Sequence, residues 1–290
     1  MNNKIIIFGG SGFLGKYFSK QLLDLNYEIT IFDLNKPDFG KSNLKYVKGN
    51  ILNYESVLKA IKDNHIVMNF AGWAEITNSH EKPFDVIKQN VEGNLVLLEA
   101  CRKKKIKRYI YASSLYVFSE YGSFYRASKQ SSELIIKEYQ KRFNIPYTIL
   151  RFGSLYGSRA DTSNGLNIII NSGLKKKKLI YGGSINAARR YIHVGDVVNV
   201  CTKVIQNKYE NKYLTITGKR LVKVKYLMKM LSESLNIPRN KIKYLNDNNR
   251  GHYDVKPTPF VTRKGKYLKI KKEKDFKKSL AYLIDELKSK

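Results

Sequence analysis

Two side chains four positions apart, Tyr125 and Lys129, could together move a proton. Residues 125–143 predict a helix, and positions i and i+4 of a helix lie on one face. An unperturbed tyrosine has a pKa of about 10, so it is a weak base at neutral pH. A neighbouring ammonium favours the phenolate and lowers that pKa. The pair therefore predicts a base that takes the proton of a sugar or alcohol hydroxyl while a hydride leaves the same carbon.

A serine pair stands where it could assist that base. Ser113 and Ser114 follow an apolar run at 108–112 that predicts a strand. Ligands of α/β proteins bind at the carboxyl ends of such strands. We therefore expect a serine hydroxyl at this position to hydrogen-bond the same substrate oxygen as the tyrosine.

A glycine pattern at the start of the chain indicates what accepts the hydride. Gly9, Gly12 and Gly15 follow the apolar run 5–8, and Asp33 ends the next apolar run, 18 residues after the third glycine. Strand, glycine turn, helix, strand and carboxylate in this order form the dinucleotide-binding fingerprint. Glycine lets the backbone approach a pyrophosphate because no Cβ intervenes, and the following helix N-terminus attracts the anion.

The cofactor is expected to be NAD rather than NADP. Asp33 can accept hydrogen bonds from the adenosine ribose and would repel a 2′-phosphate. Lys36 and Lys41 lie nearby in the sequence and act against this preference. An oxidised nicotinamide ring would also favour the phenolate of Tyr125.

Apolar patterns place strands and helices in alternation along the chain, which is typical of a parallel sheet covered on both faces. Strands are expected at 5–8, 29–32, 44–48, 66–70, 108–112, 147–152 and 213–217. Helices are expected at 14–25, 54–61, 83–104, 125–143, 196–205, 224–235 and 276–287. The expected fold class is α/β, a Rossmann doubly wound parallel sheet with a smaller, mainly C-terminal substrate-binding domain.

The alternation breaks at 156–190, where glycine and serine turns surround one short helix. We therefore expect residues 1–155, joined by 191–218, to form the NAD-binding domain. Residues 156–190 and 219–290 are expected to form the substrate-binding domain.

The chain carries a net charge of +30, mostly from lysine, with clusters at 103–105, 175–178, 264–272 and 274–278. Such a charge could attract nucleic acid or anionic lipid. The clusters contain few arginines and no aromatic stacking platform, so solvent-facing lysine is the favoured interpretation and no specific nucleic acid is expected. The field would still attract anionic small molecules.

Other features of the sequence favour a cytoplasmic protein. Two cysteines, Cys101 and Cys201, do not suggest a disulfide framework. The apolar run at 5–8 is too short for a signal peptide, and no run reaches membrane-spanning length. The histidine spacing predicts no metal site.

With these motifs the chain resembles the extended short-chain dehydrogenase/reductases, the NAD-dependent epimerase/dehydratase family that modifies nucleotide-sugars. The resemblance covers nearly the whole chain. The segments that carry it are the glycine fingerprint, Asn50-Ile51, 69–72, the Asn-Val-Glu-Gly run at 90–93, Ser113-Ser114, Tyr125-x-x-x-Lys129, the Leu-Arg-x-x-x-x-Tyr-Gly run at 150–157 and Arg189 to Asp196. Asn50 replaces the Asp of the family pattern, and Ser154 replaces its substrate-contacting Asn.

The resemblance implies roles for individual residues. The catalytic residues would be Ser114, Tyr125 and Lys129. The cofactor would be bound by Gly9, Gly12, Phe13, Leu14, Gly15, Asp33, Asn50, Ile51, Phe70, Ala71, Gly72, Asn90, Tyr125 and Lys129. The substrate would be bound by Ser114, Ser154, Arg189 and Arg250, with both arginines on the diphosphate.

Departures from the family pattern narrow the expected reaction. The sugar 4,6-dehydratases of the family carry Asp-Glu after the catalytic serine or threonine, where this chain has Leu115 and Tyr116. Neither residue can remove or deliver the C5 and C6 protons of that reaction. The epimerase-reductases of the family carry a cysteine at the position of Leu115.

These observations favour an NAD-dependent nucleotide-sugar epimerase acting at C4 through a transient 4-keto sugar. The first alternative is an NAD(P)H-dependent 4-ketoreductase of a nucleoside-diphosphate-4-keto-deoxysugar, which would use the same residues once. The second is a non-catalytic RNA-binding or scaffold protein of the same fold. The resemblance also implies a homodimer formed by helices 83–104 and 125–143. Because no apolar run is long enough, membrane insertion is not expected.

Overall fold

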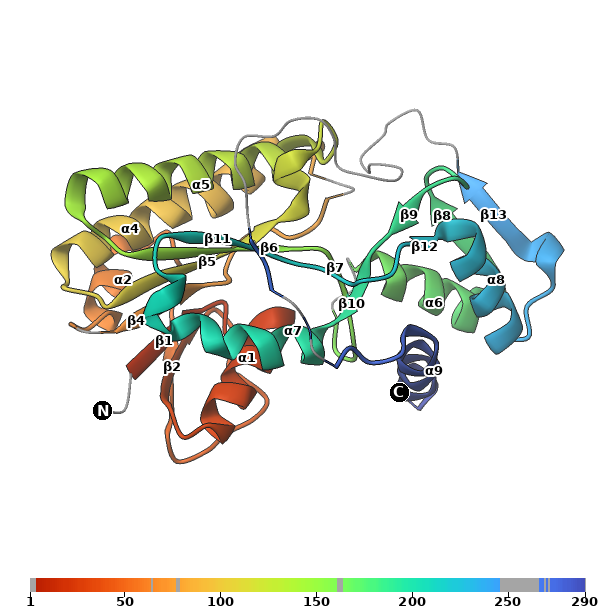
Figure 1. The fold of residues 1–290 in the computed structure, drawn as a ribbon, viewed down its shortest axis with the longest axis horizontal. Helices are drawn as coiled ribbons and strands as arrows, with labels where there is room; N and C mark the ends of the chain where they lie inside the picture. Colours follow the sequence, from red (N-terminus) through yellow and green to blue (C-terminus); the bar gives the residue numbers. More distant parts are fainter. Residues whose placement is uncertain are drawn as a thin grey trace.

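The structure is a computed structural model that describes residues 4–63, 65–76, 79–160, 164–245, 266–268, 270 and 272–289. Within these residues the chain forms a parallel eight-stranded sheet with helices on both faces. A smaller group of short strands and helices lies beside it (Figure 1). No helix in the described part of the chain is long and apolar enough to span a bilayer.

The order of the large sheet is β14-β11-β6-β5-β4-β1-β2-β3. The strands are β1 Lys4–Phe8, β2 Glu28–Asp33, β3 Leu44–Lys48, β4 Ile66–Asn69, β5 Arg108–Ser114, β6 Tyr147–Phe152, β11 Lys212–Ile216 and β14 Lys266–Tyr267. From β1 the chain winds first through β2 to β3, and then through β4 to the other edge. Ligands of such sheets bind at the carboxyl ends of the strands, where the order reverses.

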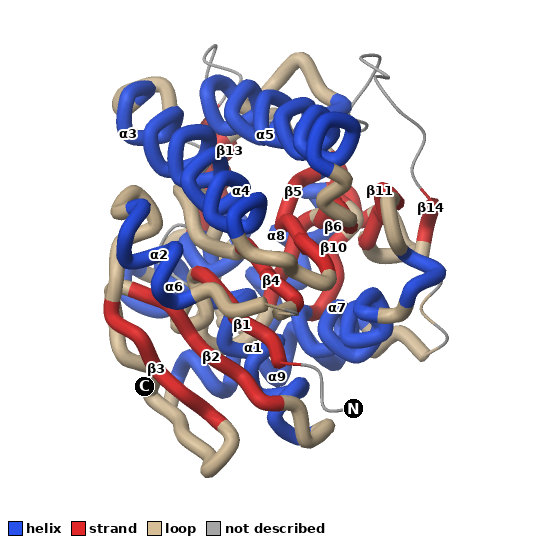
Figure 2. Tube along the Cα trace, turned by 90° about the vertical axis from the view of Figure 1, so that its left-hand side faces the viewer, coloured by secondary structure: helices blue, strands red, loops and turns tan. Residues whose placement is uncertain are grey.

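Two layers of helices cover this sheet. Helices α1 (Phe13–Asp24) and α7 (Val194–Cys201) lie on one face, and α2 (Tyr54–Ala60), α4 (Gly93–Lys103) and α5 (Ser123–Phe143) lie on the other (Figures 1 and 2).

Strand β1 shows why both faces are covered. Ile5 and Ile7 join the core with α1 and α7, whereas Ile6 and Phe8 join the core with α2, α4 and α5. Side chains alternate along a strand, so an all-apolar strand must be buried on both sides. Each core also holds one buried cysteine, Cys201 with α7 and Cys101 with α4.

The smaller group has its own core and three two-stranded ladders. These pair β7 (Ser154–Tyr156) with β10 (Tyr191–His193), β8 (Leu179–Gly182) with β13 (Ile242–Leu245), and β9 (Ala188–Arg189) with β12 (Val222–Lys223). Helices α6 (Gly165–Lys176), α8 (Val224–Ser234) and α9 (Phe276–Lys288) pack around them. Leu227 of α8 and Leu283 of α9 are both in this second core.

The predicted fold class is confirmed, because the main sheet is parallel and is wound in both directions from β1. The helix expected at 83–104 differs from the prediction. It consists of α3 (Pro83–Ile87), a π-helical turn η1 (Lys88–Glu92) and α4. The π turn is only five residues long and is flanked by α-helix on both sides, too short to be recognised from an apolar pattern.

The sequence prediction also missed all six strands of the small ladders and β14. These strands are two to four residues long, too short to show an alternating pattern. The borders expected between the two domains stay a prediction.

Candidate functional site

In the glycine turn between β1 and α1, neighbouring backbone leaves no room for a Cβ at Gly9 and Gly15. Gly9 has φ +78°, and a Cβ there would lie 2.5 Å from the Ala71 nitrogen. A Cβ on Gly15 would lie 2.1 Å from the Gly9 carbonyl oxygen. At Gly12, in contrast, a Cβ would meet only the Gly9 oxygen, at 3.3 Å. The open side of the turn is therefore at Gly12.

Helix α1 begins at this open side. Gly12 is its N-cap and supplies no side-chain acceptor to the first N–H groups. Phe13 and Leu14 pack against the core and hold the first turn in place. Free N–H groups and the helix dipole at this position suit a pyrophosphate, so the cradle fits a dinucleotide cofactor.

Asp33 lies at the end of β2 and faces the same turn. Its carboxylate accepts hydrogen bonds from the backbone N–H of Ser11 and of Asn35, both at 3.0 Å. The side chain is partly exposed. Its position beside the glycine turn is the one predicted for a carboxylate that contacts the adenosine ribose.

The loop after β4 forms a further wall of the predicted cofactor site. Phe70 packs on Phe18, and Ala71 touches the glycine turn. Gly72 has φ +135°, and a Cβ there would lie 2.3 Å from the amide oxygen of Asn90. The loop therefore requires glycine beside Asn90.

Asn90 holds this loop from the π-helical turn η1. Its Oδ1 accepts from the Trp73 N–H at 2.7 Å, and its Nδ2 donates to the Trp73 carbonyl at 3.0 Å and to Ser128 at 2.8 Å. These bonds show how Asn90 positions the cofactor wall, while a direct contact with cofactor stays a prediction. Asn50 and Ile51 follow β3, where Asn50 is exposed and Ile51 is buried.

The predicted catalytic residues come together at the carboxyl end of β5. Ser114 is the last residue of that strand, and its Oγ accepts from the Tyr116 N–H at 3.3 Å. It also hydrogen-bonds Tyr125 in the first turn of α5. One turn later, the Lys129 ammonium lies 5.8 Å from the Tyr125 ring centroid and donates to the Ala112 carbonyl at 2.9 Å.

Burial dominates the electrostatics of this pair. It raises the pKa of Tyr125 above its usual value, while the hydrogen bond with Ser114 lowers it. It lowers the pKa of Lys129 to about 8, against the attraction of Glu133, which raises it. Lys129 therefore titrates close to neutral pH, as suits a residue that tunes a proton transfer.

The residues predicted to hold substrate lie in the smaller group and at its junction with the sheet. Ser154 begins β7 and is partly exposed, and Arg189 in β9 is buried. The Arg189 Nη1 donates to the Ala188 carbonyl at 2.9 Å. Arg250 lies outside the described residues, so its predicted role is left as it stands.

A buried ionic group with no role predicted from the sequence lies behind the predicted catalytic residues. Glu133 lies two turns after Tyr125 on α5 and binds Arg151 of β6 and Ser113 of β5. The spacing of Tyr125, Lys129 and Glu133, four residues each, was a signal that could have found Glu133.

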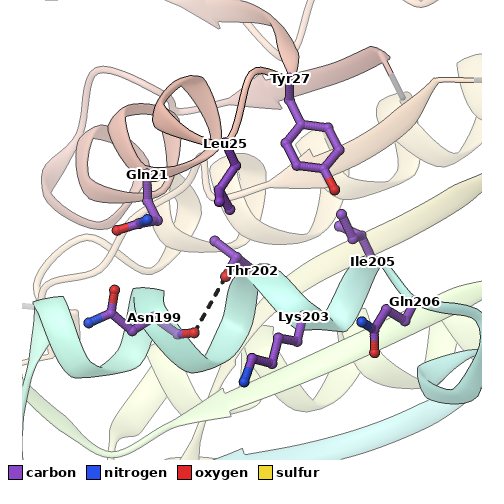
Figure 3. Close-up of a pocket in the computed structure, with 8 residues that line it drawn as sticks. All are labelled: Gln21, Leu25, Tyr27, Asn199, Thr202, Lys203, Ile205 and Gln206. Carbon is purple, nitrogen blue, oxygen red and sulfur yellow. Dashed lines mark hydrogen bonds between the residues drawn. The ribbon is translucent and has the colours of Figure 1, made fainter. Parts of the chain in front are cut away.

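A cavity of about 380 Å³ lies away from these residues, between α1 and the segment from α7 to the 3-10 turn η3 (Thr202–Ile205) (Figure 3). Gln21, Tyr27, Asn199 and Lys203 are among its lining residues. None of the predicted site residues lines it, so it plays no part in the site described above.

Comparison with known proteins gives consistent results. The family model of the NAD dependent epimerase/dehydratase family matches residues 5–216. A Methanocaldococcus jannaschii protein provisionally named UDP-glucose 4-epimerase is 30% identical over 238 residues, covering 74% of this chain and 77% of that protein. A dTDP-D-glucose 4,6-dehydratase of Dictyostelium discoideum is 27% identical over 236 residues, which cover 68% of this chain and 54% of the dehydratase.

Among solved structures, the UDP-glucuronic acid 4-epimerase of Bacillus cereus, in complex with UDP-glucuronic acid and NAD, superposes with a TM-score of 0.82. The two chains are 21% identical, and 99% of each is covered. At this identity the likeness shows the fold.

The glycine turn yields a prediction that separates folding from binding. Gly15→Ala should lower the free energy of unfolding by about 2–3 kcal/mol, because the backbone must shift to admit the new Cβ. Gly12→Ala should cost less than about 1 kcal/mol yet weaken NAD binding at least tenfold, since its Cβ enters the open side of the turn. Urea unfolding and calorimetric titration measure the two effects. Equal losses of stability in both variants would contradict this assignment.

Proposed function

The chain belongs to the NAD-dependent epimerase/dehydratase family, and from this premise we propose that it is a nucleotide-sugar epimerase acting at C4 with NAD as its cofactor. The observation that carries the proposal is the meeting of Ser114, Tyr125 and Lys129 at the carboxyl end of β5, on the edge of the parallel sheet that also carries the glycine turn after β1. Bound NAD would take up the C4 hydride and later return it.

The residues of the chain handle the proton. Tyr125 accepts the proton of the C4 hydroxyl, and the Ser114 hydroxyl orients the same oxygen. The Lys129 ammonium favours the phenolate that Tyr125 must become. When the 4-keto sugar has turned over in the pocket, Tyr125 returns the proton to the oxygen and the opposite configuration results.

The turn after Ser114 supports an epimerase over a dehydratase. Leu115 and Tyr116 occupy the 3-10 turn η2 (Leu115–Phe118), where the related dehydratases carry their acidic pair. The Tyr116 ring stands edge-on to Tyr125 at 6.2 Å between centroids, so it forms an aromatic wall beside the base. No carboxylate at these two positions can move the C5 and C6 protons of a dehydration.

The arginines of the smaller group would bind the diphosphate. Arg189 is buried in β9, where its backbone is fixed by pairing with Val222 of β12. A guanidinium donates two parallel hydrogen bonds to a phosphate, which an ammonium cannot do. Arg189 is therefore better suited than a lysine to bind the diphosphate of a nucleotide-sugar.

Two variants test the assignment of chemistry and binding. Tyr125→Phe should keep the affinity for a UDP- or GDP-sugar and lower kcat by at least about 10²-fold, because the base is lost. Arg189→Ala should weaken that affinity by about 2–3 kcal/mol, the scale of a charged hydrogen bond, and leave NAD affinity nearly unchanged. Calorimetry and a coupled C4-epimer assay with a panel of nucleotide-sugars measure both.

Other outcomes of these assays would replace the proposal. Stoichiometric consumption of reduced cofactor with a 4-keto sugar would indicate a ketoreductase. Bound RNA without bound NAD in the purified protein would indicate the non-catalytic alternative. Wild-type affinity of Arg189→Ala for every nucleoside diphosphate tested would contradict the role given to this arginine.

Cofactor choice gives a second test. NAD should bind at least about tenfold more tightly than NADP, which corresponds to roughly 1.4 kcal/mol, because Asp33 repels a 2′-phosphate. Asp33→Asn, which removes the charge, should narrow that ratio. Calorimetric titration with both cofactors measures it, and equal binding by the parent protein would refute the assignment of Asp33.

The helix layer over β4 and β5 supports a homodimer. Phe84 of α3 is 89% exposed, Leu134 of α5 is 53% exposed and Leu95 of α4 is 36% exposed. Apolar side chains gathered on neighbouring helices of one layer are typical of an association surface. A twofold pairing of this layer would bury them.

The parent protein should therefore sediment as a dimer at micromolar concentration, and Leu134→Lys should shift it towards monomer by placing a charge in the interface. Tyr282→Lys, at a 71% exposed position on α9, is the matched control and should remain dimeric. Sedimentation velocity measures the three proteins, and a monomeric parent would contradict the proposal.

A further inference from the structure

A buried ionic group lies directly behind the predicted catalytic residues. The Arg151 Nε donates to Glu133 Oε1 at 2.9 Å, and its Nη2 donates to Oε2 at 2.6 Å. Both side chains are almost inaccessible, at 0% exposure for Arg151 and 7% for Glu133. An ion pair so deeply buried is costly to desolvate and is weak evidence for stability alone, so its position needs another explanation.

The surroundings fix the pair in one geometry. The Arg151 guanidinium lies between the rings of Phe118 and Tyr213, 4.5 Å from each centroid. The Ser113 hydroxyl donates to Glu133 Oε1 at 2.6 Å. Ser113 and Arg151 are also direct neighbours in the β5–β6 pairing. Glu133 is thereby held at a single position above the end of β5.

The pair is linked to the catalytic residues along one face of α5. Tyr125, Lys129 and Glu133 are spaced by four residues and bind the last three residues of β5. Tyr125 contacts Ser114, Lys129 contacts the Ala112 carbonyl, and Glu133 contacts Ser113. A shift of Glu133 would therefore displace both Lys129 and the strand end that carries Ser114.

Resting on the proposed function, we infer that Glu133, clamped by Arg151, is a positioning residue: it keeps Lys129 charged and fixes the strand end that carries Ser114. The carboxylate stands one helical turn from the ammonium, where Cβ atoms are about 5–6 Å apart. Arg151 holds that carboxylate, so Lys129, Glu133 and Arg151 together carry a net charge of +1. A net positive charge beside Tyr125 favours its phenolate.

Within the described residues, the elements around Lys129 present the following groups to it. Tyr111 of β5 lies under the ammonium at 4.8 Å from its ring centroid, and Tyr125 and Glu133 flank it on α5. Arg151 of β6 is bound to Glu133, and Asn90 on η1 is neutral. Burial of Tyr111 raises its pKa, so it is uncharged while Lys129 titrates. Glu133 is therefore the anion in this set.

Glu133→Gln tests the inference through a pH profile. Glu133 raises the pKa of Lys129, which is about 8 in the folded protein. Loss of the carboxylate should move the alkaline limb of kcat/KM to lower pH by about one unit, the effect of one nearby charge of this kind. KM for the nucleotide-sugar should change less than about twofold, because Glu133 does not touch substrate. A folded variant with the parental alkaline limb would overturn the inference.

Glu210→Gln is the matched control. Glu210 pairs at 3.0 Å with Arg108, which is 1% exposed at the opposite end of β5. The change thus breaks another ion pair with a buried arginine of the same sheet, at the end of β5 away from Lys129, although Glu210 itself is more exposed than Glu133. Stability should fall, and the alkaline limb should stay at its parental pH. An equal shift in this control would show that the profile reports only general loosening, which would also overturn the inference.

A second readout needs no substrate. The pKa of Lys129 is about 8 in the folded protein and about 10.4 for an unfolded lysine. Above pH 8 the unfolded state therefore holds more protons, so this group makes stability rise with pH. In Glu133→Gln that rise should begin about one unit lower, measured by urea unfolding against the same proteins carrying Lys129→Met.

This readout separates the two hypotheses. If the parent turns over no nucleotide-sugar, the proposed function fails, and the unfolding series alone decides the role of Glu133. If Glu133→Gln does not fold, Glu133→Asp replaces it. That variant keeps the carboxylate charge on a side chain one methylene shorter. The alkaline limb should therefore stay within about 0.3 pH unit of its parental position, while kcat falls about tenfold because the catalytic residues are displaced. Parental kcat in Glu133→Asp would overturn the inference.

Discussion

The end of strand β5 is held by one face of helix α5, and much of the site depends on this contact. Three residues of the helix, each four apart, bind three consecutive residues of the strand. A helix and a parallel strand normally meet through apolar side chains. Where α5 meets the end of β5, however, the contacting side chains are polar and buried. Polar groups in such a place must be fully paired. The same pairing that satisfies them also fixes Tyr125 and Lys129 relative to Ser114.

A second constraint, close approach of backbones, shapes the cofactor side. Gly9, Gly15 and Gly72 each stand where a Cβ would collide with neighbouring atoms. Gly9 lets the turn after β1 lie against the loop after β4, where the strand order reverses, Gly15 lets α1 pack on that turn, and Gly72 lies against Asn90. The π-helical turn then directs Asn90 at the backbone of that loop. The cofactor cradle is thus made of backbone and buried amide groups, which leaves its surface little freedom to rearrange.

The sequence revealed those parts of the fold and site that local patterns encode. Apolar runs and the glycine spacing predicted the sheet, and the four-residue spacing of Tyr125 and Lys129 predicted their shared face. Contacts between distant segments were not predictable. Glu133 of α5 and Arg151 of β6 are 18 residues apart and meet because α5 packs against both β5 and β6, which are adjacent in the sheet. The π turn at Asn90 depends on packing against α5, where Ser132 donates to the Asn90 carbonyl at 2.9 Å.

The two cysteines lie on opposite sides of the large sheet, one in each helical layer. Burial raises the pKa of both thiols, so neither reacts while its layer stays closed. Each thiol becomes accessible only when the helices above it separate from the strands. The two thiols can therefore serve as probes of local opening. Thiol-trapping rates measured in a Cys101→Ala or a Cys201→Ala background would each report the opening of one helical layer. The opening of the layer that carries Tyr125 and of the layer that carries the predicted pyrophosphate site could in this way be measured separately.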